Sequence, residues 1–197
     1  MKPVTHLLYL HGFRSSPQST KARMTAAWVR EHRRDLVWLC PQLPASPRAA
    51  LVQMQDAIAA WPQQQMAVIG SSLGGFYATA LAEHCGCRAV LLNPAVNPAH
   101  DLASHIGETT AWHSDEPFFF RTEFVDELRA LAPGALTDHG RYLAVIAKGD
   151  EVLDWREMSA RYAGCRIKLL EGSDHALSDF SEHLPDVTRF LGLATSG

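Results

Sequence analysis

The fold is decided by the stretch Met66-Ala67-Val68-Ile69-Gly70-Ser71-Ser72-Leu73-Gly74-Gly75-Phe76. An apolar run stops at Gly70, passes two serines and resumes as apolar residues at helical spacing, which predicts a strand, a sharp turn and a helix. Gly70-x-Ser72-x-Gly74 has the form of a nucleophile elbow, in which a serine sits on a strained turn after a buried strand. Gly70 and Gly74 would let the two backbones pass closely. We interpret Ser72 as a nucleophile, and a serine that merely caps the helix is the alternative.

Strands and helices alternate along the rest of the chain. Besides the strand before the elbow, expected strands cover residues 4–10, 36–39, 89–93, 142–147 and 166–170. The first helix is expected to begin at Ser15-Ser16-Pro17, a serine and proline start signal, and to end near residue 32. Further helices are expected before Pro62, with Leu51, Met54, Ile58 and Trp61 on one face, over residues 155–162, and near the end, with Leu184, Val187, Phe190 and Leu191 buried.

This alternation predicts an α/β fold with a mostly parallel sheet, because parallel strands need crossover connections and helices supply them on both faces. Active sites in such sheets gather at the carboxyl ends of the strands. With 197 residues, of which 47% are hydrophobic, the chain suits one domain over residues 1–197. Residues 97–140 depart from the pattern and are expected to form a small cap-like insertion.

Composition excludes several classes of protein. The formal net charge is −3, and the basic residues are scattered except over residues 30–34, at a helix end, so no nucleic-acid partner is expected. The apolar run near the amino terminus is too short for a signal peptide or a membrane span. No phosphate-binding glycine motif appears, and neither histidines nor cysteines have metal-ligand spacing, so neither cofactor nor metal is expected. The four cysteines are expected to be buried free thiols in a reducing cytoplasm, and they are Cys40, Cys85, Cys87 and Cys165.

The first strand is followed by His11-Gly12-Phe13. In acyl transfer the carbonyl oxygen becomes an oxyanion, which backbone N–H groups must meet, one after the nucleophile and one from an early loop. Leu73 and Phe13 are placed to supply these donors, and Gly12 permits the tight turn. His11 precedes the nucleophile, so we expect its ring to brace the loop rather than to move protons.

A carboxylate is expected just past the strand 142–147, in Lys148-Gly149-Asp150-Glu151-Val152-Leu153-Asp154. An acid that orients a catalytic histidine belongs on such a turn, and Asp150 satisfies this. Its alternative role is to cap the next helix, for which Asp154 competes from a nearer position. We therefore place Asp150 ahead of Glu151 and Asp154.

A base is expected after the last strand, in Gly172-Ser173-Asp174-His175. Among ten histidines, His175 combines a loop after a strand, a nearby glycine and a position after both Ser72 and Asp150. The order Ser, Asp, His is that of the α/β-hydrolase triad. In this arrangement His175 would take the proton of Ser72 and Asp150 would orient the imidazole.

These motifs resemble a known family. The chain is similar to the small bacterial YqiA-type esterases of the α/β-hydrolase superfamily. The resemblance spans nearly its whole length and is carried by Leu8-Tyr9-Leu10-His11-Gly12-Phe13 with Ser15-Ser16-Pro17, Pro41-Gln42-Leu43-Pro44, Gly70-Ser71-Ser72-Leu73-Gly74-Gly75, Asn93-Pro94-Ala95-Val96, Gly149-Asp150-Glu151-Val152-Leu153-Asp154 and Phe190-Leu191-Gly192-Leu193. The resemblance implies a compact α/β-hydrolase fold and a cytoplasmic hydrolase acting on short acyl esters or acyl-CoA thioesters. The family's nucleophile, acid and base match Ser72, Asp150 and His175.

The insertion carries aromatic residues whose role is open. Trp112, Phe118, Phe119, Phe120 and Phe124 could line an acyl pocket, or they could pack the insertion onto the body. The sequence also leaves more than one function possible. A serine esterase or thioesterase acting on a small-molecule substrate is the first hypothesis. A catalytically silent binding protein with the same fold, and an acyltransferase or peptidase using the same triad, are the alternatives. The sequence does not decide the oligomeric state.

Overall fold

Six parallel strands form the main sheet of the protein, seen in a computed structural model that describes residues 2–110 and 117–194. Their order across the sheet is β2 (Val37–Leu39), β1 (His6–Leu10), β3 (Met66–Ser71), β4 (Arg88–Leu92), β7 (Tyr142–Ala147) and β8 (Arg166–Leu170). Neighbours in register include Leu10 with Gly70 and Ser71 with Leu92, so the strands end at one edge. The predicted parallel α/β sheet is confirmed.

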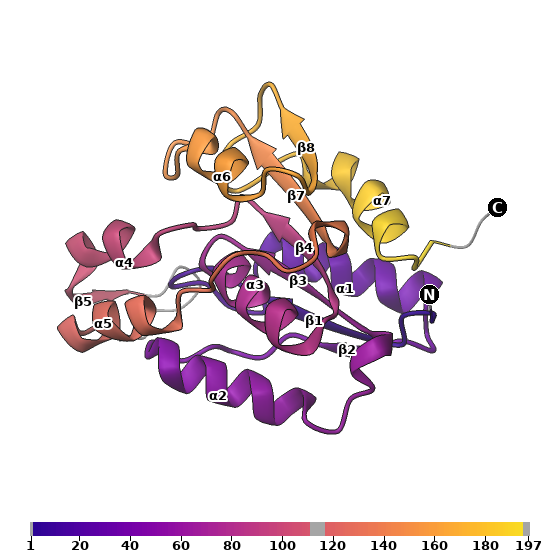
Figure 1. Cartoon of the computed structure of the whole chain (residues 1–197), viewed down its shortest axis with the longest axis horizontal. Coiled ribbons are helices and arrows are strands. Elements are labelled where there is room, and N and C mark those ends of the chain that lie inside the picture. Colours follow the sequence, from indigo (N-terminus) through magenta and orange to yellow (C-terminus); the bar gives the residue numbers. More distant parts are fainter. Residues whose placement is uncertain (1, 111–116, 195–197) are drawn as a thin grey trace.

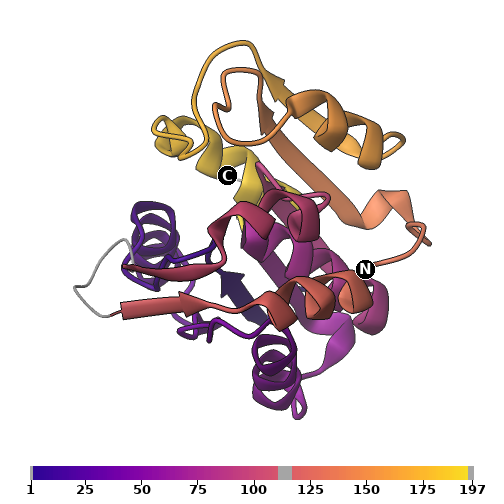
Figure 2. The same cartoon turned by 90° about the vertical axis from the view of Figure 1, so that its left-hand side faces the viewer.

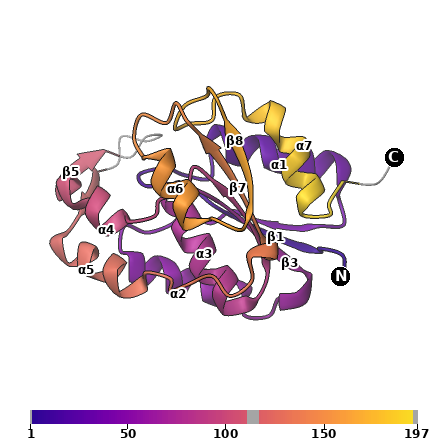
Figure 3. The ribbon, with the colours of Figure 1, turned by 45° about the horizontal axis from the view of Figure 1, so that its top comes forward.

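Helices cover both faces of this sheet (Figures 1 and 3). One face carries α1 (Thr20–His32) and α7 (Phe180–Phe190), and the other carries α2 (Pro47–Ile58), α3 (Leu73–Cys85) and α6 (Trp155–Arg161). Side chains alternate along β1, so Leu7 and Tyr9 pack toward α1 and α7, whereas Leu8 and Leu10 pack toward α2 and α3. All of these β1 side chains are fully buried, which explains why the strands read as unbroken apolar runs.

The segment between β4 and β7 adds elements outside the main sheet. They are α4 (Pro98–Asp101), β5 (Gly107–Thr110), β6 (Pro117–Phe120) and α5 (Thr122–Leu131), with short 3-10 helices at Ala103–His105 and His139–Arg141, and another lies at Gln63–Gln65 before β3. Strands β5 and β6 pair antiparallel in a sheet of their own. Figure 2 shows this pair beside α4 and α5 at one end of the molecule. Their role as a cap stays a prediction.

The predicted start of the first helix is wrong by several residues. Helix α1 begins at Thr20 because the preceding residues form a turn. The Ser16 hydroxyl accepts a hydrogen bond from the Gln18 N–H at 3.1 Å, and the Ser16 carbonyl accepts one from the Ser19 N–H at 3.0 Å. The serine and proline signal therefore marks a turn that leads into the helix. Helix α2 similarly ends at Ile58, so Trp61 lies beyond it.

The cysteines are all free, but only Cys87 is buried, while Cys40, Cys85 and Cys165 are half-buried. The expectation of buried thiols therefore holds for one of the four. In the described part of the chain, no helix is both long and apolar enough to cross a membrane.

Candidate active site

Ser72 occupies a strained turn between β3 and α3. Its backbone has φ 53° and ψ −120°, which is an unusual conformation for a residue other than glycine. A Cβ atom on Gly70 would lie 2.2 Å from the Gly74 carbonyl oxygen, and one on Gly74 would lie 2.0 Å from the Leu10 carbonyl oxygen. Neither position has room for a side chain, so the glycines let β1, β3 and α3 pack closely enough to form the elbow.

A chain of hydrogen bonds joins Ser72, His175 and Asp150. The Ser72 Oγ lies 3.1 Å from His175 Nε2, and His175 Nδ1 lies 2.8 Å from Asp150 Oδ2. A carboxylate can only accept, so Nδ1 carries the proton when the imidazole is neutral. The lone pair of Nε2 then faces the Ser72 hydroxyl, which is the orientation that a general base needs.

Asp150 contacts the His175 imidazole, whereas Asp154 and Glu151, the other two candidates for the acid, bind backbone N–H groups. Its side chain is fully buried, and Oδ1 accepts hydrogen bonds from the N–H groups of Val152 and Leu153, both at 2.8 Å. Asp154 caps α6 by accepting from the Arg156 N–H. The fixed turn after β7 thus aims one oxygen of Asp150 at His175.

Glu151, the other competitor, holds the histidine loop from outside. Its Oε2 accepts a hydrogen bond from the backbone N–H of His175 at 3.0 Å. The loop after β7 and the loop that carries His175 are therefore joined twice, once through the Asp150 side chain and once through the Glu151 side chain.

Asn93 joins the same two loops from inside the protein and has no role in the sequence analysis. Asn93 is fully buried at the end of β4, and its backbone has a positive φ of 42°. The amide nitrogen donates to the carbonyls of Asp174 at 2.9 Å and His175 at 3.2 Å, while the amide oxygen accepts from the Ala147 N–H at 2.8 Å. In the sequence, the sign of this positioning role is a polar residue that directly follows an apolar strand and precedes a proline.

The two residues expected to supply oxyanion donors lie near Ser72. Leu73 is the first residue of α3, whose leading N–H groups have no acceptor inside the helix. Phe13 and Leu73 both line the cavity that contains Ser72. Gly12 packs against Ser72, because a Cβ there would lie 3.3 Å from the Ser72 Cβ. A side chain on Gly12 would also crowd the Ser72 hydroxyl, because the added Cβ would lie 3.8 Å from Oγ.

His11 is buried beneath this loop. Its Nε2 accepts a hydrogen bond from the Leu43 N–H at 3.1 Å, so Nδ1 carries the proton and donates to the Gly12 carbonyl at 2.9 Å. These contacts fit the bracing role predicted for His11.

A cavity of about 510 Å³, hereafter the Ser72 cavity, opens beside Ser72. One wall is formed by the loop after β1 and the first turn of α1, including Arg14 and Lys21. The other wall comes from α4 and the loop after β7, including Leu102 and Leu153. This volume is within the usual range for small-molecule sites.

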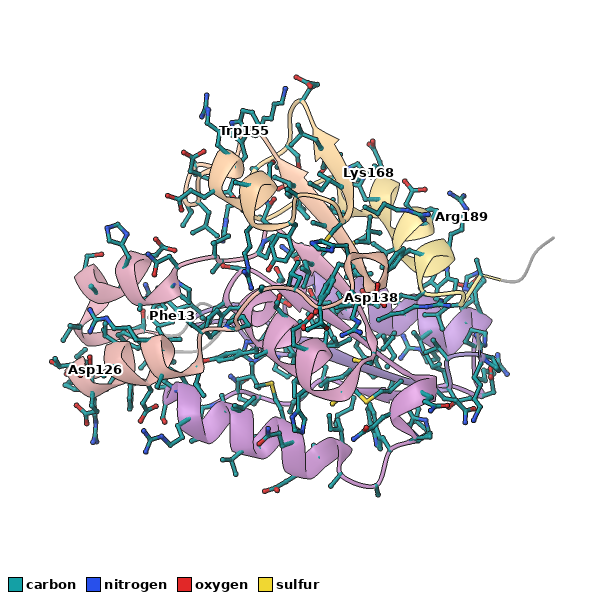
Figure 4. All side chains as sticks on the ribbon, viewed as in Figure 1. Phe13, Asp126, Asp138, Trp155, Lys168 and Arg189 are labelled. Carbon is teal, nitrogen blue, oxygen red and sulfur yellow. The ribbon has the colours of Figure 1, made fainter. Side chains whose placement is uncertain are left out.

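Among the described aromatic residues of the insertion, Phe118, Phe119, Phe120 and Phe124 do not line this cavity. Phe120 is fully buried, and Phe118 and Phe120 each pack edge-on against Phe13 with ring centroids 5.2 Å apart. Phe119 points to the other side of the strand and is 52% exposed. Of the two roles left open by the sequence, packing is the one these contacts match, and the acyl-pocket role of Phe118, Phe119 and Phe120 stays a prediction. Trp112 lies outside the described residues. Figure 4 labels Phe13 at the end of the molecule where α4 and α5 lie.

Solved structures share this fold at low sequence identity. A protein from Agrobacterium vitis S4 superposes with a TM-score of 0.77 at 15% identity, covering 96% of this chain and 90% of that one. Est1E from Butyrivibrio proteoclasticus, with ferulic acid bound, gives a TM-score of 0.69 at 14% identity over 97% and 89%. The esterase domain of a Rhodothermus marinus protein gives 0.67 at 21% identity over 96% and 88%. The fold is that of the α/β-hydrolases.

Bacterial relatives match along nearly their whole length. A UPF0227 protein of Serratia proteamaculans is 25% identical over 95% of this chain and 99% of its own. A UPF0227 protein of Yersinia enterocolitica is 26% identical over the same shares. The family resemblance seen in the sequence motifs is confirmed. Since the model of the Uncharacterised protein family (UPF0227) matches residues 6–192, the chain belongs to this family.

Proposed function

We propose that the protein is a serine hydrolase that cleaves carboxylic esters through an acyl-enzyme on Ser72. The observation that carries this proposal is the hydrogen-bond chain from the Ser72 Oγ through His175 to the buried Asp150. This chain ends in a cavity large enough for a small ester. The shared fold of hydrolases and esterases supports the proposal by analogy.

The reaction follows from these positions. His175 Nε2 takes the hydroxyl proton as the Ser72 Oγ bonds to the ester carbonyl carbon. The carbonyl electrons move to oxygen, and the N–H groups of Phe13 and Leu73 receive that negative charge. When the tetrahedral intermediate collapses, the bond to the leaving alcohol or thiol breaks, and His175 protonates the leaving group. Asp150 stabilises the imidazolium throughout.

Water completes the cycle. His175 removes a proton from a water molecule, the oxygen attacks the acyl carbon, and Ser72 leaves with the proton returned by His175. Every step uses groups of the chain itself. Short acyl esters fit the cavity volume, and acyl-CoA thioesters can react by the same steps because a thiol is also a suitable leaving group. The free cysteines suit a reducing compartment, so we place the enzyme in the cytoplasm.

A chromogenic short-chain ester assay tests this proposal. We expect the parent protein to hydrolyse p-nitrophenyl butyrate, and Ser72→Ala to lower kcat by about 10⁴-fold or more. Ser181→Ala is the matched control, because Ser181 is exposed on α7 and does not line the Ser72 cavity. Hydrolysis that persists unchanged in Ser72→Ala would refute the assignment, and a parent without turnover on any ester would favour the silent binding protein.

A further inference from the structure

A lysine lies unexpectedly close to the proposed catalytic groups. Lys21 stands in the first turn of α1, half-buried, and lines the Ser72 cavity. Its ammonium donates a hydrogen bond to the backbone carbonyl of Ala176, the residue after His175. A cation is therefore fixed in the same cavity as the nucleophile and next to the base.

This ammonium lacks an ionic partner. Among the described residues, no carboxylate oxygen lies within 4.0 Å of Lys21 Nζ. Burial lowers the pKa of Lys21 to about 8, although the more distant Asp174 and Asp150 act to raise it. A partly desolvated charge is costly unless it is paired. The missing partner can be supplied by a ligand in the cavity.

The same wall of the cavity favours negative charge in other ways. The first turn of α1 carries the positive end of the helix dipole, and the preceding Ser19 makes no side-chain cap bond to it. Arg14 lines the same wall and holds its place by donating from Nε to the Thr110 carbonyl at 2.7 Å. The side chains of Arg14 and Lys21 thus both reach the cavity from the segment that comprises the loop after β1 and the first turn of α1.

The acidic groups of the cavity lie elsewhere and have partners. Glu151 accepts the His175 N–H, and Asp101 lies 3.4 Å from the His100 ring. The cationic and acidic side chains that line the cavity therefore come from different elements, the cations from the loop after β1 and α1, and the acids from α4 and the loop after β7. A ligand with one anionic end would be oriented by this difference.

We propose that Lys21 binds a carboxylate or phosphate group of the substrate, so that the enzyme prefers anionic esters to neutral ones. This inference rests on the proposed ester hydrolysis at Ser72. The anionic group can belong to the acyl part or to the leaving group, and the ammonium recognises either by the same ion pair. Lys21 acts as a specificity residue, because its charge distinguishes substrates and does not take part in the proton transfers.

Matched substrates test the preference. p-Nitrophenyl butyrate is neutral, p-nitrophenyl hemisuccinate carries its anion on the acyl part, and 3-carboxyphenyl butyrate compared with phenyl butyrate carries it on the leaving group. We expect Lys21→Met to lower kcat/KM for at least one anionic ester by about tenfold more than for its neutral counterpart, equivalent to about 1.4 kcal/mol. Lys21→Arg should keep most of the preference because it keeps the charge.

Lys168→Met is the matched control, because Lys168 pairs with Asp186 and does not line the Ser72 cavity. We expect it to change neither ratio. An equal loss for anionic and neutral esters in Lys21→Met would overturn the proposal, since it would reduce Lys21 to a support for the His175 loop. So would the absence of any anionic preference in the parent.

A binding measurement separates this proposal from the proposed function. Ser72→Ala is titrated with 4-phenylbutyrate and with the neutral 4-phenylbutyramide, observed by ligand NMR. We expect the anion to bind more tightly, and the difference to vanish in Ser72→Ala/Lys21→Met. Equal binding of the two ligands contradicts the role of Lys21 whether or not the parent turns over esters, whereas failure of ester hydrolysis contradicts only the proposed function.

Discussion

The side-chain amide of Asn93 holds the backbone of His175, donating a hydrogen bond to its carbonyl at 3.2 Å. The same amide group accepts from Ala147, the last residue of β7, at 2.8 Å. One buried side chain therefore sets the distance between the strand end that leads to Asp150 and the loop that carries His175. The geometry of the proposed triad depends on a residue that touches none of the proposed reacting atoms.

Asn93→Asp should impair turnover more than binding. The carboxylate can still accept from Ala147, but it cannot donate to the carbonyls of Asp174 and His175 and would repel them. We expect a fall in kcat of at least about tenfold, which corresponds to about 1.4 kcal/mol, with KM nearly unchanged. Unfolding in urea should show a loss of about 2–4 kcal/mol from the buried unsatisfied groups. Asn97→Asp is the control, because Asn97 is exposed and makes no cap bond; an equal effect there would contradict the positioning role.

Two aspartates of one loop should respond differently to the same change. Asp150→Asn presents an amide N–H to His175 and favours the wrong tautomer, so kcat should fall by about 10⁴-fold. Asp154→Asn keeps the cap of α6, because asparagine caps helices as well as aspartate does. Its activity should stay within about twofold of the parent. Comparable losses in both variants of the p-nitrophenyl butyrate assay would remove Asp150 from the triad.

Gly74→Ala should prevent the elbow from forming. The new Cβ would meet the Leu10 carbonyl at 2.0 Å, and the nearest atoms are all backbone atoms of Leu10 and His11, which have little room to move. We expect a loss of about 3 kcal/mol or more in the free energy of unfolding, or no soluble protein. Gly134→Ala, with open space around the added atom, should change stability little. If thermal unfolding of the two variants were alike, the close passage of α3 over β1 would be wrong.

The anionic preference should disappear as pH rises. Burial lowers the pKa of Lys21 to about 8, so its charge is present below that pH and lost above it. For the parent, kcat/KM for p-nitrophenyl hemisuccinate should therefore decline above about pH 8 relative to p-nitrophenyl butyrate, and this ratio should be flat in Lys21→Met. The comparison with Lys21→Met isolates this titration from the other ionisable groups around the cavity, which are Arg14, Asp101, His105, Asp150, Glu151, Asp174 and His175.

The lowered pKa of Lys21 also affects the free energy of unfolding, which should increase as pH rises while the anionic preference falls. Between about pH 8 and 10.5 the unfolded chain holds the Lys21 proton and the folded chain does not, so the contribution of this group to folding improves as pH rises. Any stability advantage of Lys21→Met over the parent at pH 7 should shrink by pH 10, as measured by urea unfolding. A constant difference would show that the ammonium is not desolvated.

The sequence predicts the parts of this molecule that depend on local pattern. The elbow around Ser72 has a spacing imposed by backbone contact, and the strand ends before Asp150 and His175 stand out as turns after apolar runs. These features place the three side chains at one sheet edge before any coordinates are known. The parallel order of the strands follows from the same alternation.

Other parts depend on contacts through space and could not be read in this way. Asn93 and Lys21 contact loops that lie 54 or more positions away in the chain, and no local pattern distinguishes them. The β5 and β6 pair lies in a segment without clear periodicity, so the burial of Phe120 and the exposure of Phe119 became clear only from the pairing. Ser16 shows that a helix-start signal can mark a turn instead, because its hydroxyl accepts from the Gln18 N–H before α1 begins.

The most direct measurement is the intact mass of the protein after incubation with a fluorophosphonate, followed by peptide mapping. The parent should gain one covalent adduct, located on Ser72, and Ser72→Ala should gain none. His175→Gln should be labelled far more slowly, because the hydroxyl loses its base. An adduct on another residue, or an unmodified parent under conditions that label a known serine esterase, would contradict the proposed nucleophile.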